Sequence, residues 1–183
     1  MAATVLDDAI YRKSIGSFAA GVTVITTKLD GVPYGMSASS VASLSLDPIL
    51  LLVCVKTTLP THSAIESRGR FAVNILGEGQ ENLAYKFARP SEDKFQGVKI
   101  EDHESSIPLL ADAIAFFVCE VDQRLPGGDH SIFIGRVTDC GHTHDTRPLL
   151  YFRSGFGTFE TDEEALRRVA DSWGAATGSW GGL

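Results

Sequence analysis

The chain has 183 residues, of which 44% are hydrophobic and 21% charged, a composition typical of one globular domain with a sizeable core. Its formal net charge of −7 argues against a nucleic acid or an anionic membrane as a partner. Two of its three cysteines, Cys54 and Cys119, lie in apolar runs without a CxxC pair, so reduced core thiols are expected. The N-terminal segment lacks a signal peptide's apolar core, and the longest apolar run, residues 49–55, is too short to cross a membrane. A soluble, cytoplasmic protein is therefore expected.

The first third of the chain predicts a helix followed by strands. Residues 7–18 place apolar side chains at helical spacing after a capping aspartate. Strands are expected over 22–27 and 32–39, because both are rich in strand-forming residues and Asp30-Gly31 between them is a strong hairpin signal. Residues 49–55 are apolar on both faces, as expected for a central strand or a barrel wall.

The rest of the chain mixes short helices and strands without regular alternation. A helix is expected after residue 60, with Thr61 or Ser63 as its cap and Gly69 at its end. The other expected elements are helices over 80–88 and 161–173, a surface loop over 89–98, strands over 71–76, 115–121, 131–138 and 149–152, and a turn over 122–130. This pattern favours a β-barrel with peripheral helices over a doubly wound fold. Residues 1–160 are expected to form the barrel domain, and 161–183 a C-terminal helix with a mobile tail.

Several catalytic motifs are absent, and the polar clusters that remain have more than one interpretation. There is no phosphate-binding loop, hydrolase elbow or zinc-protease motif. The segment HTHD, residues 142–145, is expected to be a solvated loop rather than a metal site. His130 stands where a turn meets a strand, either as a polar strand start or as a functional residue at a barrel rim.

A row of serines lies between two apolar segments, in the stretch GMSASSVASLSLDP of residues 35–48. A nucleophilic serine would need a base and an oxyanion hole, and nothing local supplies them. Small residues that fill a barrel, or a polar edge for a flat heteroaromatic ligand, remain equally good interpretations. Ser43 and Ser45 alternate with two leucines and are expected to face away from the core.

Taken in order, several segments resemble the flavin reductase-like family. They are FAAGVTVITT, DGVPYGMSASSVASLSLDPILLLVCV, SRGRFAVNILGEGQENLAYKFA, GGDHSIFIGRV and RPLLYFRSGFGTF, and they span about residues 7–159. One departure is DPILL, where the family commonly has DPPLV. The resemblance implies an FMN-binding split β-barrel that binds FMN or FAD as a homodimer, with flavin sites near the subunit interface. It also implies hydride transfer from NADH or NADPH to the flavin, which then leaves for a separate oxygenase component.

The resemblance also assigns site residues. His130 corresponds to a histidine near the meeting point of nicotinamide and flavin, which is the catalytic position. Ser37, Ala38, Ser39 and Ser40 correspond to the segment along the isoalloxazine edge. The other cofactor-binding positions are Val53, Cys54, Val55, Lys56, Thr57, Thr58, Thr61 and Ser63 for ribityl and phosphate, Phe71, Val73 and Asn74 beside the flavin, Lys94 and Phe95 in a loop, and Tyr151, Phe152 and Arg153 near the end. Lys56, Lys94 and Arg153, with backbone amides, can meet the phosphate. No metal ligand is expected.

The reaction that the resemblance implies suits these residues, because hydride transfer needs oriented rings more than a strong acid–base pair. The prediction is an NAD(P)H:flavin oxidoreductase that supplies a partner monooxygenase. Two alternatives remain: a flavoprotein with tightly bound flavin that reduces another acceptor, and a non-enzymatic flavin carrier or sensor. The choice between FMN and FAD, between NADH and NADPH, and of the oxygenase is open.

Overall fold

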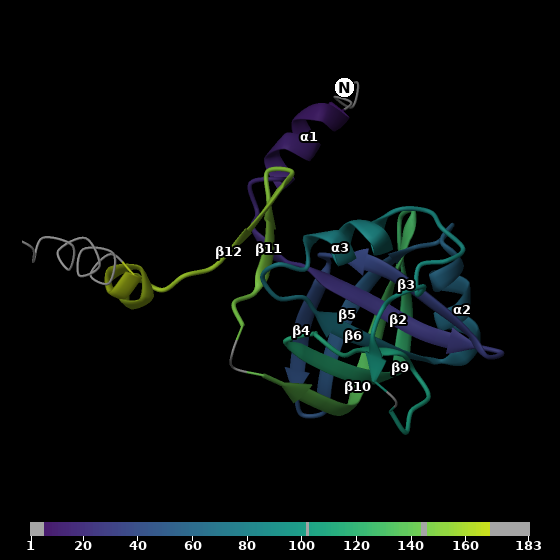
Figure 1. The fold of residues 1–183 in the computed structure, drawn as a ribbon. Helices are drawn as coiled ribbons and strands as arrows, with labels where there is room; N and C mark the ends of the chain where they lie inside the picture. Colours follow the sequence, from purple (N-terminus) through teal and green to yellow (C-terminus); the bar gives the residue numbers. More distant parts are fainter. Residues whose placement is uncertain (1–5, 102, 144–145, 169–183) are drawn as a thin grey trace, which may run out of the picture.

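The computed structural model describes residues 6–101, 103–143 and 146–168 (Figure 1). The labelled helices in this part of the chain are α1 (Asp8–Ile15), α2 (Pro60–Arg68) and α3 (Glu81–Ala88), and residues 162–168 are also helical. The strands there are β1 (Ala20–Gly21), β2 (Thr23–Leu29), β3 (Val32–Ala38), β4 (Val41–Leu46), β5 (Ile49–Lys56), β6 (Arg70–Ile75), β7 (Ile100–Glu101), β8 (Leu109–Leu110), β9 (Ala115–Gly127), β10 (His130–His142), β11 (Leu149–Phe152) and β12 (Gly155–Thr158). The prediction of a mainly β protein with peripheral helices is confirmed.

One curved antiparallel sheet forms the body of the molecule. Among the described strands its order is β3-β2-β6-β9-β10-β5-β4. Alternate side chains of β5 point inward, so Leu51, Val53 and Val55 are buried while their neighbours are half-buried. The inward side chains of β2, β5, β6, β9 and β10 form one hydrophobic core. β5 pairs with β10 on one side and with the edge strand β4 on the other, as expected for a barrel wall, and its outer face is only partly covered.

Close packing inside this sheet depends on a glycine in β10. A Cβ at Gly135 would lie 2.6 Å from the Phe71 ring and 2.8 Å from Cβ of Cys119. Glycine thus allows the fully buried Phe71 ring to lie directly against the β10 backbone. Burial, with a smaller effect of Cys140, raises the pKa of Cys119 to about 12, as expected for the core thiol that the sequence predicts.

The helices α2 and α3 lie on the periphery of the sheet (Figure 1). Helix α2 buries Ala64 and Ile65, and it ends at Gly69 in a left-handed conformation, as predicted. Its start was predicted wrongly: the N-cap is Leu59, which makes no side-chain capping bond, and Pro60 follows at the first helical position. Proline is favoured there because its missing N–H would be unpaired in any case.

An arm leaves the body of the molecule, formed by α1, β1, β11 and β12 (Figure 1). These three strands form a separate sheet in the order β1-β11-β12. Helix α1 starts at an Asp7 cap as predicted, but none of its residues is buried. Ile10, Tyr11, Ile15 and Phe18 are 60%, 55%, 53% and 74% exposed, so the predicted apolar face of this helix is uncovered in the single chain.

The β9–β10 hairpin is longer than the sequence indicates. Residues 122–130 were expected to form a turn, yet β9 continues to Gly127 and β10 begins at His130. Only Gly128 and Asp129 connect them, and Gly128 has a φ of 71°, which suits a tight two-residue hairpin. The Pro-Gly-Gly signal was placed correctly, but the pairing of Pro126 with Ser131 extends the ladder up to it.

Other differences concern short or peripheral segments. β4 was not predicted, and neither were the short strands β1, β7, β8 and β12. Residues 162–168 are helical, whereas the rest of the helix predicted over 161–173 and the predicted mobile tail lie outside the described residues. None of the helices that the structure describes is long and apolar enough to span a membrane.

Candidate active site

A groove of about 660 Å³ opens between β3, the start of α2 and the segment after α3. Its walls are largely apolar, and they come from parts of the chain that are distant in sequence. The lining residues are Val32, Pro33, Tyr34, Gly35, Met36, Ser37, Leu59, Pro60, Thr61, Phe87, Ala88, Pro90, Ser91, Glu92, Lys94 and Phe95. Four residues predicted to bind cofactor, Ser37, Thr61, Lys94 and Phe95, are thus brought together here.

A glycine in β3 allows α3 to approach the floor of the groove. A Cβ at Gly35 would meet the Phe87 ring at 2.6 Å, and Phe87 in turn packs edge-to-face on Phe95 with ring centroids 5.1 Å apart. The hydroxyl of Ser37 donates a 2.6 Å hydrogen bond to the carbonyl of Ala84. Direct contacts between β3 and α3 therefore fix the relative position of these two walls of the groove.

Lys94, in the segment after α3, links β3 to α3. Its ammonium group donates hydrogen bonds to the carbonyls of Gly35 (3.1 Å) and Phe87 (3.0 Å). Partial burial lowers the pKa of Lys94 below its ordinary value. Since an ammonium group has three donors, one N–H remains for an anion in the groove.

The N-terminus of α2 forms another wall and is open to a ligand's charge. No side chain caps it, since the N-cap Leu59 makes no capping bond. The first backbone N–H groups of a helix carry a partial positive charge and commonly bind phosphate. In α2 Pro60 has no N–H and the His62 N–H donates to the Leu59 carbonyl (2.9 Å), so Thr61 is the first residue whose N–H can meet a ligand. In an acidic protein, this end of α2 and the Lys94 ammonium are the local groups that attract an anion.

A polar rim adjoins the groove through the turn after β5. His130 begins β10 and pairs with Lys56 at the end of β5. The ring nitrogen Nδ1 of His130 is 2.7 Å from Oδ1 of Asp129, and Nζ of Lys56 is 3.9 Å from Oδ2 of the same carboxylate. The chain then runs from Lys56 through Thr57 and Thr58 to Leu59 and Thr61, which line the groove, so the turn after β5 links the rim to the groove.

The serine row lies partly at this site. Ser39 and Ser40 are exposed between β3 and β4, and the Ser40 hydroxyl donates to the carbonyl of Cys54 at 3.2 Å. The prediction that Ser43 and Ser45 face away from the core holds for Ser43, which is exposed, but is wrong for Ser45, because the two leucines are more exposed than it is. Leu44 is 46% and Leu46 85% exposed, whereas Ser45 is half-buried. A bulge between Ser43 and Ser45 breaks the alternation on which the prediction depended.

Three predicted cofactor residues of β6 lie inside the core instead. Phe71, Val73 and Asn74 are 0%, 1% and 0% exposed. The amide nitrogen of Asn74 donates to the Val24 carbonyl (3.0 Å) and the Thr26 hydroxyl (3.1 Å), and its oxygen accepts from the Leu110 N–H (2.9 Å). In this structure these side chains therefore have no free surface for a ligand.

The remaining predicted residues divide between core, surface and arm. Val53 and Val55 are fully buried, Cys54 is half-buried, Ala38 is half-buried at the end of β3, and Ser63 is exposed on α2. On the arm, Tyr151 and Phe152 are 39% and 44% exposed, and the Arg153 guanidinium lies 5.0 Å from the centre of the Phe152 ring. The single chain does not bring these arm residues into the groove.

Sequence reasoning missed part of the site. Tyr34, Phe87 and Pro90 line the groove, yet in the sequence they have no feature that separates them from ordinary core or loop residues. Asp129 contacts both His130 and Lys56, and its position directly before His130 in GGDH was the available signal.

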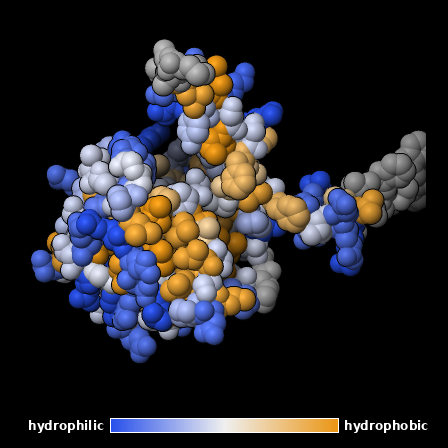
Figure 2. Space-filling model, turned by 180° about the vertical axis from the view of Figure 1, so that it is seen from behind, coloured by the Kyte–Doolittle hydropathy of each residue, from blue (hydrophilic) through white to orange (hydrophobic). Residues whose placement is uncertain are grey.

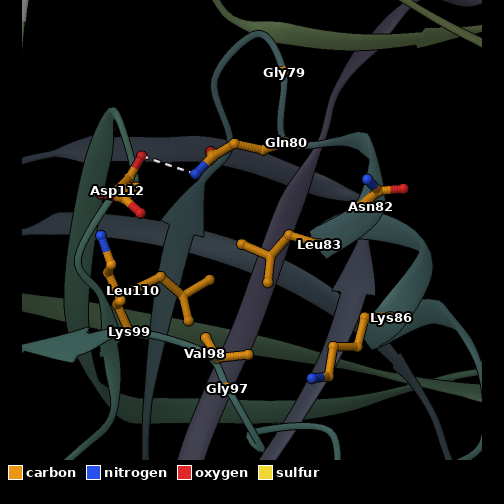
Figure 3. A pocket seen from close by; sticks show the side chains of 10 residues that line it. All are labelled: Gly79, Gln80, Asn82, Leu83, Lys86, Gly97, Val98, Lys99, Leu110 and Asp112. Carbon is orange, nitrogen blue, oxygen red and sulfur yellow. Dashed lines mark hydrogen bonds between the residues drawn. The ribbon is translucent and has the colours of Figure 1, made fainter.

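A smaller hollow lies on the other face of α3, and two of its polar side chains, Gln80 and Lys86, bond to the backbone around it (Figure 3). The side chain of Gln80 accepts from the Gly77 N–H and donates to the Asp112 carbonyl, and the Lys86 ammonium donates to the Gln96 carbonyl. Lys86 and Lys99 lie at opposite ends of it in Figure 3. These groups hold the local fold, so the groove with its rim is the better site. Elsewhere among the described residues, no three His, Cys, Asp or Glu side chains are grouped to bind a metal; of HTHD, residues 144 and 145 lie outside that part.

The groove and rim fit a flavin by their chemistry. A flavin joins a flat heteroaromatic ring to a ribityl phosphate. Apolar walls suit the ring, while the α2 N-terminus and the third N–H of Lys94 suit the phosphate. The turn before α2 leads from the groove back to the rim, where the His130 imidazole can orient a ring, and hydride transfer between two cofactors needs no strong acid–base pair.

Comparison with known proteins agrees with this chemistry. Residues 15–160 match the flavin reductase like domain. The reductase component of a 4-nitrophenol 4-monooxygenase/4-nitrocatechol 2-monooxygenase from Rhodococcus opacus is 42% identical over 167 residues, which cover 91% of this chain and 89% of that protein.

Solved structures of flavin reductases have the same fold. An NADH:FAD oxidoreductase from Streptomyces globisporus, solved with NAD and FAD fragments, is 36% identical with a TM-score of 0.81, covering 87% of this chain and 99% of its own. The flavin reductase PheA2 is also 36% identical, with a TM-score of 0.77, and covers 85% of this chain and 100% of its own. The predicted split-barrel fold is thereby confirmed. The chain belongs to the family of the flavin reductase like domain.

Proposed function

We propose that this protein is an NAD(P)H-dependent flavin reductase that supplies reduced flavin to a separate oxygenase component. The observation that carries the proposal is the apolar groove with the uncapped start of α2 in its wall, to which the turn after β5 joins the His130 rim. The relative from Rhodococcus opacus, a reductase component of a monooxygenase, supports the same activity.

The reaction is a two-electron transfer. A hydride leaves C4 of the reduced nicotinamide for N5 of the flavin, so the nicotinamide is oxidised, the flavin is reduced, and any further proton comes from solvent. The flavin supplies the electron-accepting ring. The protein's own residues hold the two rings in register: Lys94 and the start of α2 hold the phosphate end, and His130 orients the reacting edge.

The groove is open to solvent along one side, which suits a flavin that must leave after reduction. Weak binding of the flavin is therefore expected, so that it behaves as a substrate. Either FMN or FAD, and either NADH or NADPH, satisfies the groups identified in the site.

The decisive experiment is steady-state oxidation of NADH and NADPH by gel-filtered protein, with FMN, FAD or riboflavin added. We expect saturable dependence on added flavin. Turnover with an artificial acceptor that is independent of added flavin would indicate a tightly bound flavin instead. No flavin-dependent oxidation with either nicotinamide would overturn the proposal.

We further infer that the protein acts as a homodimer in the cytoplasm. The uncovered apolar side chains of α1, together with Leu46 and Ile49 next to the barrel edge, give a second copy a large surface to cover. Figure 2 shows hydrophobic surface on the rear of the barrel and along the arm. Cys54, Cys119 and Cys140 are all free thiols, which suits a reducing compartment.

A further inference from the structure

Asp129 contacts His130, Lys56 and Thr57 of the rim. One carboxylate oxygen is 2.7 Å from Nδ1 of His130, and the other is 3.9 Å from the Lys56 ammonium. Its backbone carbonyl accepts two hydrogen bonds from Thr57, one from the N–H at 3.0 Å and one from the hydroxyl at 3.1 Å. A single residue of the β9–β10 turn thus joins the catalytic position to the turn that leads into the groove.

The backbone holds this carboxylate in place. Gly128 takes the positive φ of the two-residue turn, and the bonds from Thr57 fix the following peptide group. The side chain of Asp129 is therefore presented to His130 from a constrained backbone, although it is 71% exposed.

The contact determines which ring nitrogen carries the proton. An ionised carboxylate can only accept, so the proton of neutral His130 must lie on Nδ1, and Nε2 is left with its lone pair. An aspartate is ionised at neutral pH, and the hydrogen bond from His130, as the largest cause, lowers the pKa of Asp129 below its ordinary value.

We infer that Asp129 is the positioning residue of this reductase: its carboxylate fixes the tautomer and orientation of His130, while its backbone carbonyl, which any residue would supply, is held by Thr57. With Nδ1 engaged, the ring presents Nε2 to the reacting rings in one defined state. Lys56 is the other charged group facing this pair, and it holds the second carboxylate oxygen. The inference rests on the proposed role of His130 in flavin reduction, and its test separates the two.

The test uses Asp129→Ala in the full-length protein, because alanine keeps the backbone bonds to Thr57 and removes only the carboxylate. The matched control is Asp139→Ala, which removes the carboxylate 2.9 Å from Nε2 of His103, outside the groove and rim. Long-range ¹H–¹⁵N spectra of histidine-labelled protein report the tautomer of each ring. His130→Gln assigns the signals of His130.

We expect the Nδ1–H form of His130 in the unchanged protein and its loss in Asp129→Ala, with the Asp139→Ala spectrum altered only at His103. In Asp129→Ala, the rate constant of flavin reduction measured by stopped flow at saturating flavin should fall roughly three- to tenfold. This is the effect expected from the loss of one charge-assisted hydrogen bond in an exposed setting. Flavin affinity should stay within about twofold of that of the unchanged protein. An unchanged His130 tautomer in Asp129→Ala would overturn the inference. A changed tautomer with an unchanged reduction rate would instead overturn the role of His130 in the reaction.

Discussion

Strand β6 and the β9–β10 turn both contain residues that resemble cofactor-binding positions, but the structure places them in opposite surroundings. Asn74 of β6 is fully buried and its amide group is engaged by three protein partners. The side chain of His130 is 39% exposed, and Asp129 is the one hydrogen-bond partner of its ring identified among the described residues. A family motif can therefore mark a residue that holds the scaffold as well as one that meets the ligand, and burial distinguishes the two.

The largest expected effect is on stability, from Asn74→Ala. The change leaves the Val24 carbonyl and the Leu110 N–H without their partner inside the core. We expect the free energy of unfolding to fall by about 2–4 kcal/mol. Urea denaturation followed by circular dichroism measures this loss.

Asn82→Ala is the matched control for Asn74→Ala, because Asn82 is exposed on α3. We expect it to change stability by no more than about 0.5 kcal/mol. A folded Asn74→Ala protein with normal stability but much weaker flavin binding would contradict the structural role of Asn74 and restore direct contact.

The next effect is on the reaction rate, from His130→Ala. The rim residue contacts no core group, so the fold should be retained while orientation at the reacting edge is lost. We expect the rate constant of flavin reduction to fall roughly 10- to 100-fold, with a smaller change in the flavin dissociation constant. Stopped-flow reduction beside flavin titration separates the two quantities. A loss confined to flavin affinity would argue that His130 only binds.

The smallest expected effect on the single chain comes from the arm, through Ile15→Asp. Ile15 is 53% exposed and packs on no core, so the stability of the barrel should change little. If the arm contributes to a homodimer, a charge at this position should weaken association by tenfold or more, because an unpaired charge would be buried. Light scattering across a dilution series measures the dimer fraction. The control is Lys13→Asp, a charge change on an exposed polar residue of the same helix. Equal dimerisation of Ile15→Asp and the unchanged protein would exclude the arm from the interface.

Much of the fold was accessible from the sequence because its signals are local. The Asp30-Gly31 hairpin, the Asp7 cap of α1 and the Gly69 end of α2 each depend on backbone preferences of a few residues. The start of α2 was missed because the prediction placed its cap at Thr61 or Ser63, whereas Pro60 already occupies the first helical position. The predicted alternation of side chains across Ser43 and Ser45 failed because a bulge interrupts it, and the bulge depends on pairing with β5 rather than on the residues of the strand itself.

The candidate site was only partly predictable because it is assembled from distant segments. Ser37, Thr61 and Lys94 could be assigned to the cofactor by resemblance, and the structure brings them to one groove. Their neighbours Tyr34 and Phe87 could not, because an aromatic residue that lines a groove looks the same in a sequence as one that fills a core.

By itself, the sequence determined the class of fold, the Asp30-Gly31 hairpin, the Asp7 start of α1, the Gly69 end of α2 and the family, because periodicity, turn chemistry and an ordered set of motifs are properties of the chain alone. Only the tertiary structure decided that Asn74 holds the core, that Asp129 holds His130, and that the arm's apolar face stays uncovered in one chain. Burial and hydrogen-bond partners depend on which distant segments pack together, and a linear sequence does not state that.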